Sequence, residues 1–319
     1  MKDGTKIALL AAGILLLLGV GAMIGGMRAL RFDFTRLGTA DPVTRTAEFT
    51  EPITDISLKG VHCETVLKPA PDGVCRVVFT GGEKLLLHAS AESGTLTVSV
   101  EDGRKWYEMI GVFSFSDGLT VFLPEREYGS LTVELTSGSL EIPEDFVFSA
   151  LTVQNVSGAV KLAASADRLN VHTTSGAISV NGVRAKQAEI GSTSGSIRLS
   201  EVNAEETLTV ETTSGSVTLE KCSAREIFAC STSGGIRLSE ADAEDTLTVE
   251  SISGGIRLDG GQAQKTEITS SSGSVKGTVT GEYLYDVRTS SGSISVPESG
   301  GSRLFRVTTS SGSVRIEQK

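Results

Sequence analysis

A Ser-Gly pair recurs at short, even intervals through the C-terminal part of the chain, and this spacing constrains the fold more than any other feature. The recurring glycines are 18 to 20 residues apart. Ten copies at such an even period are typical of a solenoid, in which similar coils stack on one another. The glycines are Gly138, Gly158, Gly176, Gly195, Gly215, Gly234, Gly254, Gly273, Gly292 and Gly312.

Apolar residues alternate with other residues on both sides of each glycine. In the copy around Gly215, Leu208 and Val210 precede the corner, and Val217 and Leu219 follow it. A period of two indicates a strand with one buried face, so each copy contributes two strands joined by a sharp corner. A single coil cannot bury its own apolar face, whereas coils stacked about 4.8 Å apart can. We therefore expect an all-β fold: a single-stranded parallel β-helix of ten coils over residues 131–319, right-handed as parallel crossovers usually are.

The serine before each glycine forms a second regular column. A small hydroxyl at a tight turn can bond nearby backbone groups and stack on its copies, so we expect a structural role. A ligand surface made of these serines is the alternative.

An uncharged, apolar run of 21 residues occupies positions 7–27. This length is sufficient to cross a bilayer as a helix, so we expect a membrane anchor within residues 1–27. Basic residues flank the run on both sides, and the positive-inside rule therefore gives no orientation. We expect a single-pass protein of the cell membrane with an extracellular C-terminal domain. A signal peptide cleaved near Val20-Gly21-Ala22 is the alternative, although the run is longer than a usual signal-peptide core.

Two segments connect the expected anchor to the solenoid. Residues 28–45 have no clear period and predict a linker. Residues 46–130 predict strands without the clean repeat. We expect this segment to form degenerate coils that cap the first edge of the solenoid, because terminal repeats are often atypical. Its richest apolar cluster consists of Trp106, Tyr107, Met109, Ile110, Phe113 and Phe115.

The last coil ends without any capping sequence after it. Its charged residues Arg315, Glu317 and Lys319 would discourage further strand pairing at an exposed edge. Pairing of this end with a partner is the alternative.

Composition and motifs argue against several classes of function. The formal net charge of −10 disfavours nucleic-acid binding. The three histidines are scattered, the four cysteines form no CxxC pair, and no nucleotide-binding or catalytic motif is present, so we expect no metal, cofactor or catalytic site. We expect the cysteines to be unpaired, with a Cys63–Cys75 disulfide as the alternative.

A carbohydrate-active enzyme on a β-helix is the remaining catalytic alternative, and it needs carboxylates clustered on neighbouring coils. Acidic residues do gather at the turns, but no long insertion builds the walls of a groove. We therefore expect a protein that is not an enzyme. The acidic residues at the turns include Glu201, Glu205, Glu206, Glu240, Asp242, Glu244 and Asp245.

Three residues after each glycine, the alternation places a side chain on the outside of the coil. Cations hold six of these ten positions. They could form a stripe that binds an anionic glycan or a teichoic polymer, and a solvated face that resists aggregation is the alternative. The candidate contact residues are Lys161, Arg198, Arg237, Arg257, Lys276 and Arg315.

The chain resembles a bacterial family of β-strand-repeat proteins that is labelled both a domain of unknown function and "putative adhesin". The resemblance covers residues 46–319 and is carried by an N-terminal span, a β segment ending in Leu-Thr-Val-Phe-Leu-Pro at 119–124, and many coils of the form Leu-x-Val-x-Thr-Thr-Ser-Gly-Ser-Val-x-Leu. It implies a membrane-anchored, adhesin-like surface protein. The partner would be a cell-wall polymer, a glycan or a membrane protein. A membrane-anchored accessory protein of envelope-stress sensing is the alternative that the resemblance also leaves open.

Overall fold

The computed structural model describes residues 15–16, 18–21, 24–25, 28, 42–103 and 117–319. Within these residues nearly all regular structure is strand, and no helix is both long enough and apolar enough to cross a membrane. Most of the predicted span at 7–27, and the predicted apolar cluster at 106–115, lie outside the described residues.

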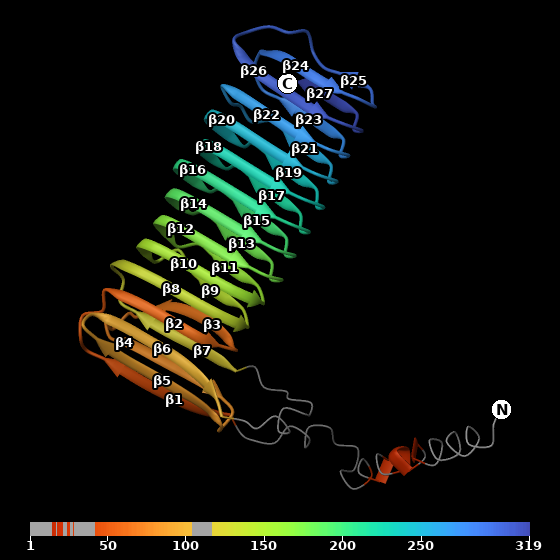
Figure 1. Cartoon of the computed structure of the whole chain (residues 1–319). Helices are drawn as coiled ribbons and strands as arrows, with labels where there is room; N and C mark the ends of the chain where they lie inside the picture. The colour runs from red at the N-terminus through yellow and green to blue at the C-terminus, as the bar shows by residue number, and fades with distance from the viewer. Residues whose placement is uncertain (1–14, 17, 22–23, 26–27, 29–41, 104–116) are drawn as a thin grey trace, which may run out of the picture.

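The described chain forms a parallel β-solenoid, which confirms the all-β fold expected from the repeat (Figure 1). Within residues 127–319, twenty strands alternate between two stacks that we call the long-strand sheet and the short-strand sheet. The handedness of the winding stays a prediction. The long strands are β8 (Glu127–Ser137), β10 (Val147–Ser157), β12 (Ser165–Thr173), β14 (Arg184–Ser192), β16 (Asn203–Thr212), β18 (Ser223–Ser231), β20 (Asp242–Ser251), β22 (Lys265–Ser270), β24 (Tyr283–Thr289) and β26 (Arg303–Thr309). The short strands are β9 (Leu140–Ile142), β11 (Val160–Leu162), β13 (Ile178–Asn181), β15 (Ile197–Ser200), β17 (Val217–Glu220), β19 (Ile236–Ser239), β21 (Ile256–Asp259), β23 (Val275–Val279), β25 (Ile294–Ser295) and β27 (Val314–Gln318).

Equivalent residues of neighbouring coils pair directly, so the apolar positions form continuous buried columns. Leu208 of β16 lies opposite Ile227 of β18, and Val210 lies opposite Ala229. All four side chains are at most 1% exposed. Each apolar column therefore runs the length of the stack, as the alternation in the sequence predicts.

Close backbone contact explains the glycine at each Ser-Gly corner. A Cβ atom on Gly215 would lie 1.9 Å from the carbonyl oxygen of Gly195, far inside van der Waals contact. The same clash, at 2.4 Å or less, recurs at all ten recurring glycines, and below Gly138 the contact continues to the carbonyl of Cys63. Any other residue would push two coils apart.

From Thr173 onward, the hydroxyl that holds the Ser-Gly corner is three residues before the glycine rather than next to it, whereas the first two coils have Leu135 and Asn155 at this position. The Thr212 hydroxyl accepts a hydrogen bond from the Gly215 amide at 3.1 Å, and the Ser192 hydroxyl accepts one from the Gly195 amide at 2.8 Å. These hydroxyls are buried, whereas the serine before the glycine is exposed from Ser157 onward. The structural role expected for the serine column thus belongs mainly to this inner column of Ser and Thr.

A second corner follows each short strand, and the sequence pattern did not predict it. The chain turns there through a residue of positive φ, for example Glu201 at 54° and Lys221 at 52°. Small buried residues come next, such as Val202 and Ala204. A bulge at the start of the long strand absorbs the extra residue of the longer coils, because the pairing register shifts there between β16 and β18.

The N-terminal end combines two coils with antiparallel strands. The coil β2/β3 stacks on β8/β9, and the coil β6/β7 stacks on β2/β3, all in parallel. Beyond them, β4 and β5 pair antiparallel with β7 and β6, and β1 pairs antiparallel with β4. The expected degenerate coils therefore account for only part of this segment, and β1 begins inside the expected linker. The strands are β1 (Val43–Phe49), β2 (Asp55–Val61), β3 (Glu64–Pro69), β4 (Cys75–Gly81), β5 (Leu85–Glu92), β6 (Thr95–Asp102) and β7 (Gly118–Leu123).

The C-terminal end departs from sequence order. The last coil of the sequence, β26/β27, lies between β22/β23 and β24/β25, so the end of the stack is the second-to-last coil. Figure 1 shows β24 and β25 at the C-terminal end of the rod, with β27 inside it. The expectation that the final coil is the exposed edge is therefore wrong.

Two local features favour this exchange. Pro297 follows β25, and because proline has no N–H it is poorly suited to a coil with neighbours on both sides. Tyr283 of the end coil is 1% exposed, and its ring centroid lies 5.6 Å from that of Phe305 in β26. The Tyr283 hydroxyl accepts a hydrogen bond from the Ala263 amide at 3.4 Å, so this side chain links the end coil to a coil two steps below.

Candidate functional site

The six predicted cations lie in one outward-facing column of the short-strand sheet. All six side chains are exposed, because they alternate with the buried apolar columns on either side. Two uncharged residues, Ser179 and Thr218, share this column with the cations. The order along the column is Lys161, Ser179, Arg198, Thr218, Arg237, Arg257, Lys276 and Arg315.

Four of these cations occupy directly neighbouring strands. Arg237 pairs with Arg257, Arg257 with Lys276, and Lys276 with Arg315. We call these four residues the cation ladder. Adjacent strands are about 4.8 Å apart, so the ladder extends over roughly 14 Å. Arg198 and Lys161 stand apart, each separated from the next cation by an uncharged residue.

The exchange of the last two coils completes the ladder. In sequence order, Ser295 would follow Lys276 and would separate it from Arg315. In the structure, Arg315 pairs with Lys276, and Ser295 pairs with Arg315 at the end of the column. The sequence therefore predicted the members of the ladder but not its continuity.

The ladder carries little compensating negative charge. Arg315 forms an ion pair with Glu317 at 3.2 Å, and among the described residues no ion pair is formed by Arg237, Arg257 or Lys276. Two unit charges about 5 Å apart in water repel each other by roughly 1 kcal/mol before salt screening. A bound anion would relieve this repulsion, so the ladder is suited to negatively charged ligands.

Two of the outward positions beside the ladder carry no side chain. Two residues before Arg237 and Arg257, the outward positions are held by Gly235 and Gly255, which have no side chains. On the other flank are small or acidic residues, of which Asp259 is the nearest carboxylate in sequence to Arg257. A long anionic chain could therefore lie along the column without displacing a side chain.

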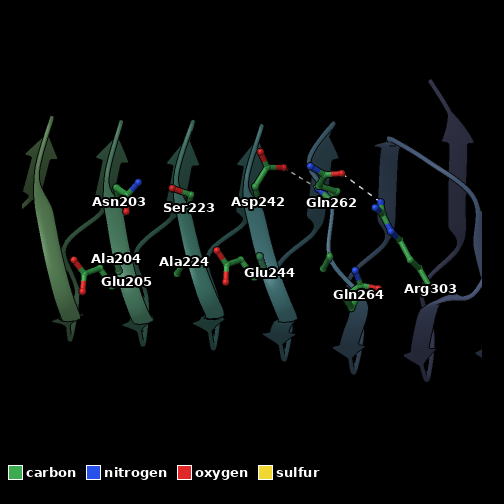
Figure 2. A pocket seen from close by; sticks show the side chains of 12 residues that line it. Asn203, Ala204, Glu205, Ser223, Ala224, Asp242, Glu244, Gln262, Gln264 and Arg303 are labelled. Carbon is green, nitrogen blue, oxygen red and sulfur yellow. Dashed lines mark hydrogen bonds between the residues drawn. The ribbon is translucent and has the colours of Figure 1, made fainter.

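A separate hollow of about 510 Å³ follows the second corner over the starts of β16, β18 and β20, residues 262–264 before β22, and Arg303 of β26. Figure 2 shows Gln262 between Asp242 and Arg303: its backbone N–H donates to Asp242 Oδ1 at 3.0 Å, and its Oε1 accepts from Arg303 Nη1 at 3.3 Å. Glu205 and Glu244 also line this hollow, but β18 lies between their strands. Three of the acidic residues considered for catalysis, Glu205, Asp242 and Glu244, therefore line this hollow. Glu205 and Glu244 are not on neighbouring strands.

The cysteines are free thiols, as the sequence predicted. Burial is the main cause that raises the pKa of Cys63 to about 12 and that of Cys75 to about 11. Both thiols are therefore protonated at neutral pH. Among the described residues, no group of three or more His, Cys, Asp and Glu side chains could hold a metal ion.

Comparison with known proteins gives one family and several solved structures. The family model described as "Toastrack DUF4097" matches residues 53–317. A structure described as a putative adhesin from Parabacteroides distasonis ATCC 8503 is 10% identical, covers 88% of this chain and 98% of its own, and has a TM-score of 0.48. One described as a putative lipid binding protein from the same strain is 16% identical with the same coverage and a TM-score of 0.44.

A third structure is described as a putative cell adhesion protein from Clostridium sporogenes ATCC 15579. It is 8% identical, covers 88% of this chain and 100% of its own, and has a TM-score of 0.25. No curated protein matches the chain. At these identities and TM-scores, the solved structures say nothing about what this chain binds.

Proposed function

The chain belongs to the Toastrack DUF4097 family, and we propose that it is a non-enzymatic, adhesin-like interaction protein that binds an anionic polymer through the cation ladder. The observation that carries the proposal is the run of four exposed cations on neighbouring strands, three of which form no ion pair among the described residues. Such a run is electrostatically unfavourable without a ligand.

A polymer fits the ladder better than a small anion. The four cations are evenly spaced along a line of roughly 14 Å, so one small anion can contact only two of them at a time. A chain with repeated negative groups can contact all four, and each further contact forms at a high effective concentration. A cell-wall polymer of the teichoic type and an anionic glycan both have this chemistry.

The proposed setting is the outer face of the cell membrane. The uncharged run at residues 7–27 supports a single-pass anchor at the N-terminal end of the solenoid. The acidic balance of the whole chain, with a formal net charge of −10, would limit non-specific attachment to other polyanions. Binding would then depend on the local cation ladder rather than on the overall charge.

The test compares two double variants of the full chain. Arg237→Ser with Arg257→Ser removes two adjacent ladder cations, whereas Lys161→Ser with Arg198→Ser removes two isolated cations from the same column. The probe is poly(glycerol phosphate), measured by calorimetry at several salt concentrations. We expect about a tenfold weaker affinity for the ladder variant, since each lost contact removes roughly 0.5–1 kcal/mol of screened attraction.

The control variant should lose less than about threefold, because each of its cations is separated from the next cation by an uncharged residue and adds only an isolated contact. Equal losses in the two variants would overturn the assignment to the ladder. Absence of binding by the unaltered chain to poly(glycerol phosphate) and to dextran sulfate at low salt would overturn the polymer proposal itself.

A further inference from the structure

The C-terminal end of the long-strand sheet is an open strand edge. The inward-facing Tyr285 and Val287 of β24 are only half-buried, whereas the equivalent positions of interior coils are fully buried. Leu284 of β24 is 55% exposed, and Ile294 of β25 in the short-strand sheet is 45% exposed. The end therefore exposes both apolar side chains and the unpaired side of β24, a combination that favours pairing with another strand.

The loop after β25 covers only the first part of this edge. The Gly300 amide donates to the Tyr283 carbonyl at 2.9 Å, and the Tyr285 amide donates to the Ser299 hydroxyl at 3.1 Å. Backbone groups of alternate residues point to the same side of a strand, so those of Val287 and Thr289 also point away from β26. The groups of Val287 lie beyond the loop and can pair with an incoming strand. In an antiparallel pair centred on Val287, those of Thr289 meet Tyr285 of the incoming strand once the Ser299 hydroxyl releases the Tyr285 amide.

We propose that two copies of the chain pair end to end through β24, antiparallel, with the two-fold axis at Val287. In this register Val287 faces Val287 of the second copy as a hydrogen-bonded pair, since its N–H and C=O both point to the open edge. Asp286 then faces Arg288 of the second copy on the outer surface, and Arg288 faces Asp286. The contact is self-complementary, as a two-fold interface must be.

Charge selects this register over the neighbouring ones. A shift in one direction would place Asp286 opposite Asp286, and a shift in the other would place Arg288 opposite Arg288. Like charges directly opposite each other destabilise a strand pair, whereas opposite charges stabilise it. Within one copy, Asp286 forms ion pairs with Arg288 and Arg306, both at 3.1 Å, so both charges already lie on the outer face of β24.

The pairing closes after two copies and stays confined to one sheet. The two N-terminal ends point outward and are formed by different strands, so the contact cannot propagate into a filament. In the short-strand sheet, β25 has only two residues and precedes Pro297, which limits extension of that edge. If the chain is anchored at its N-terminal end, as proposed above, the pairing joins copies on two facing surfaces; the pairing itself does not depend on that anchor.

The experiment measures the mass of the full chain in detergent by light scattering, in a concentration series up to about 100 µM, where weak specific pairing is detected. We expect a dimer that Arg288→Asp abolishes, because it places two carboxylates opposite each other at both contacts. Asp286→Arg should abolish it in the same way with two cations. A mixture of these two variants should restore the dimer, since each copy then faces the opposite charge.

A second variant separates loss of pairing from loss of folding. Val287→Pro removes an N–H that points to the open edge and that β26 does not use, and proline is tolerated on edge strands. It should give a monomer with unchanged circular dichroism and unchanged binding of poly(glycerol phosphate). A monomer at every concentration would overturn the proposal, and so would a dimer that survives all three single variants, because it would then form through another surface.

Discussion

At its N-terminal end the solenoid finishes on antiparallel strands, whereas at its C-terminal end it finishes on a repeat coil taken out of sequence order. β4 and β5 reverse direction and pair with the last parallel coil, and β1 adds a further antiparallel strand. At the other end, β24/β25 is similar in sequence to the interior coils and keeps their parallel direction. One end thus changes the pattern of pairing, and the other keeps it.

The difference shows two ways in which a repeat can end. At the N-terminal end, antiparallel strands occupy the edge on which the next parallel coil would pair, and so discourage addition of a further parallel coil. The C-terminal end instead places its least suitable coil last: Pro297 cannot donate to a neighbour, and β25 is only two residues long. Only the long-strand sheet remains open there, which is why we place the self-pairing surface at β24.

The largest effect should come from removing the ends in turn. Deletion of residues 301–319 removes an interior coil, although these residues are the last in the sequence. The end coil then loses its observed neighbour, and we expect residues 283–295 to lose most of their hydrogen-exchange protection, because Pro297 and the lost packing of Tyr283 on Phe305 disfavour stacking of this coil directly on β22/β23. Deletion of residues 43–50 removes only the outermost strand β1, so protection should fall in β4 and stay unchanged in β7. Retained protection over 283–295 in the first deletion would show that the end coil stacks equally well on β22/β23, and that Pro297 and Tyr283 do not decide the coil order.

A smaller effect is expected when a glycine of the Ser-Gly column is replaced by alanine in an interior coil and in the C-terminal end coil. Gly215→Ala places a Cβ atom 1.9 Å from the Gly195 carbonyl in a coil with neighbours on both sides, and should destabilise the protein by about 3 kcal/mol. Gly292→Ala produces a 2.4 Å contact with Gly312, but the end coil can move away, so about 1 kcal/mol is expected.

Urea unfolding together with hydrogen exchange measures both glycine variants. Equal losses at the two positions would show that the end coil is held as rigidly as the interior.

The smallest effect is the loss of stability at the C-terminal end as the pH falls. Arg306 of β26 forms ion pairs with Glu267 of β22 and with Asp286 of β24, so the exchanged coil is linked to both neighbours. A hydrogen bond from Arg306 lowers the pKa of Asp286 below its ordinary 3.8. Lys265 and then Arg306 lower that of Glu267 below 4.5. A lowered carboxyl pKa stabilises the folded state fully above the unfolded-state value, and this contribution is lost as the pH falls through the folded-state value.

Hydrogen-exchange protection of β24 should therefore decrease as the pH falls from 6 to 3. Arg306→Gln should make this protection less dependent on pH. Because the charged groups are exposed, the variant should change the Tm by only about 1 °C. Arg76→Gln is the matched control at the N-terminal end. Arg76 pairs there with Glu48 of β1 and with Asp72, whose pKa it lowers. This control should leave β24 unaffected. A pH dependence of β24 that is the same in all three proteins would exclude the Arg306 network as its source.

Much of the fold could be predicted because each coil repeats the same alternation of apolar residues and the same Ser-Gly corner. The alternation around Leu208 and Val217 predicted both sheets and their buried faces, and the spacing of the glycines predicted the stack. The cation column followed from the same alternation. The inner hydroxyls, such as Thr212, were not predicted, because the serine directly before each glycine recurs more regularly and was assigned the structural role instead. The bulged corner after each short strand was also missed, since its residues vary from coil to coil.

The sequence by itself determined most of the coil: its length, its Ser-Gly corner, its buried faces and the residues that point outward. These properties depend on contacts between a residue and the equivalent residue of whichever coil lies next to it. Only the tertiary structure decided the order of the last coils, because similar coils can exchange places with little change in those contacts. The choice rests on Pro297 at the edge and on the packing of Tyr283 on Phe305. That choice brought Arg315 next to Lys276 and turned a row of predicted cations into a continuous ladder.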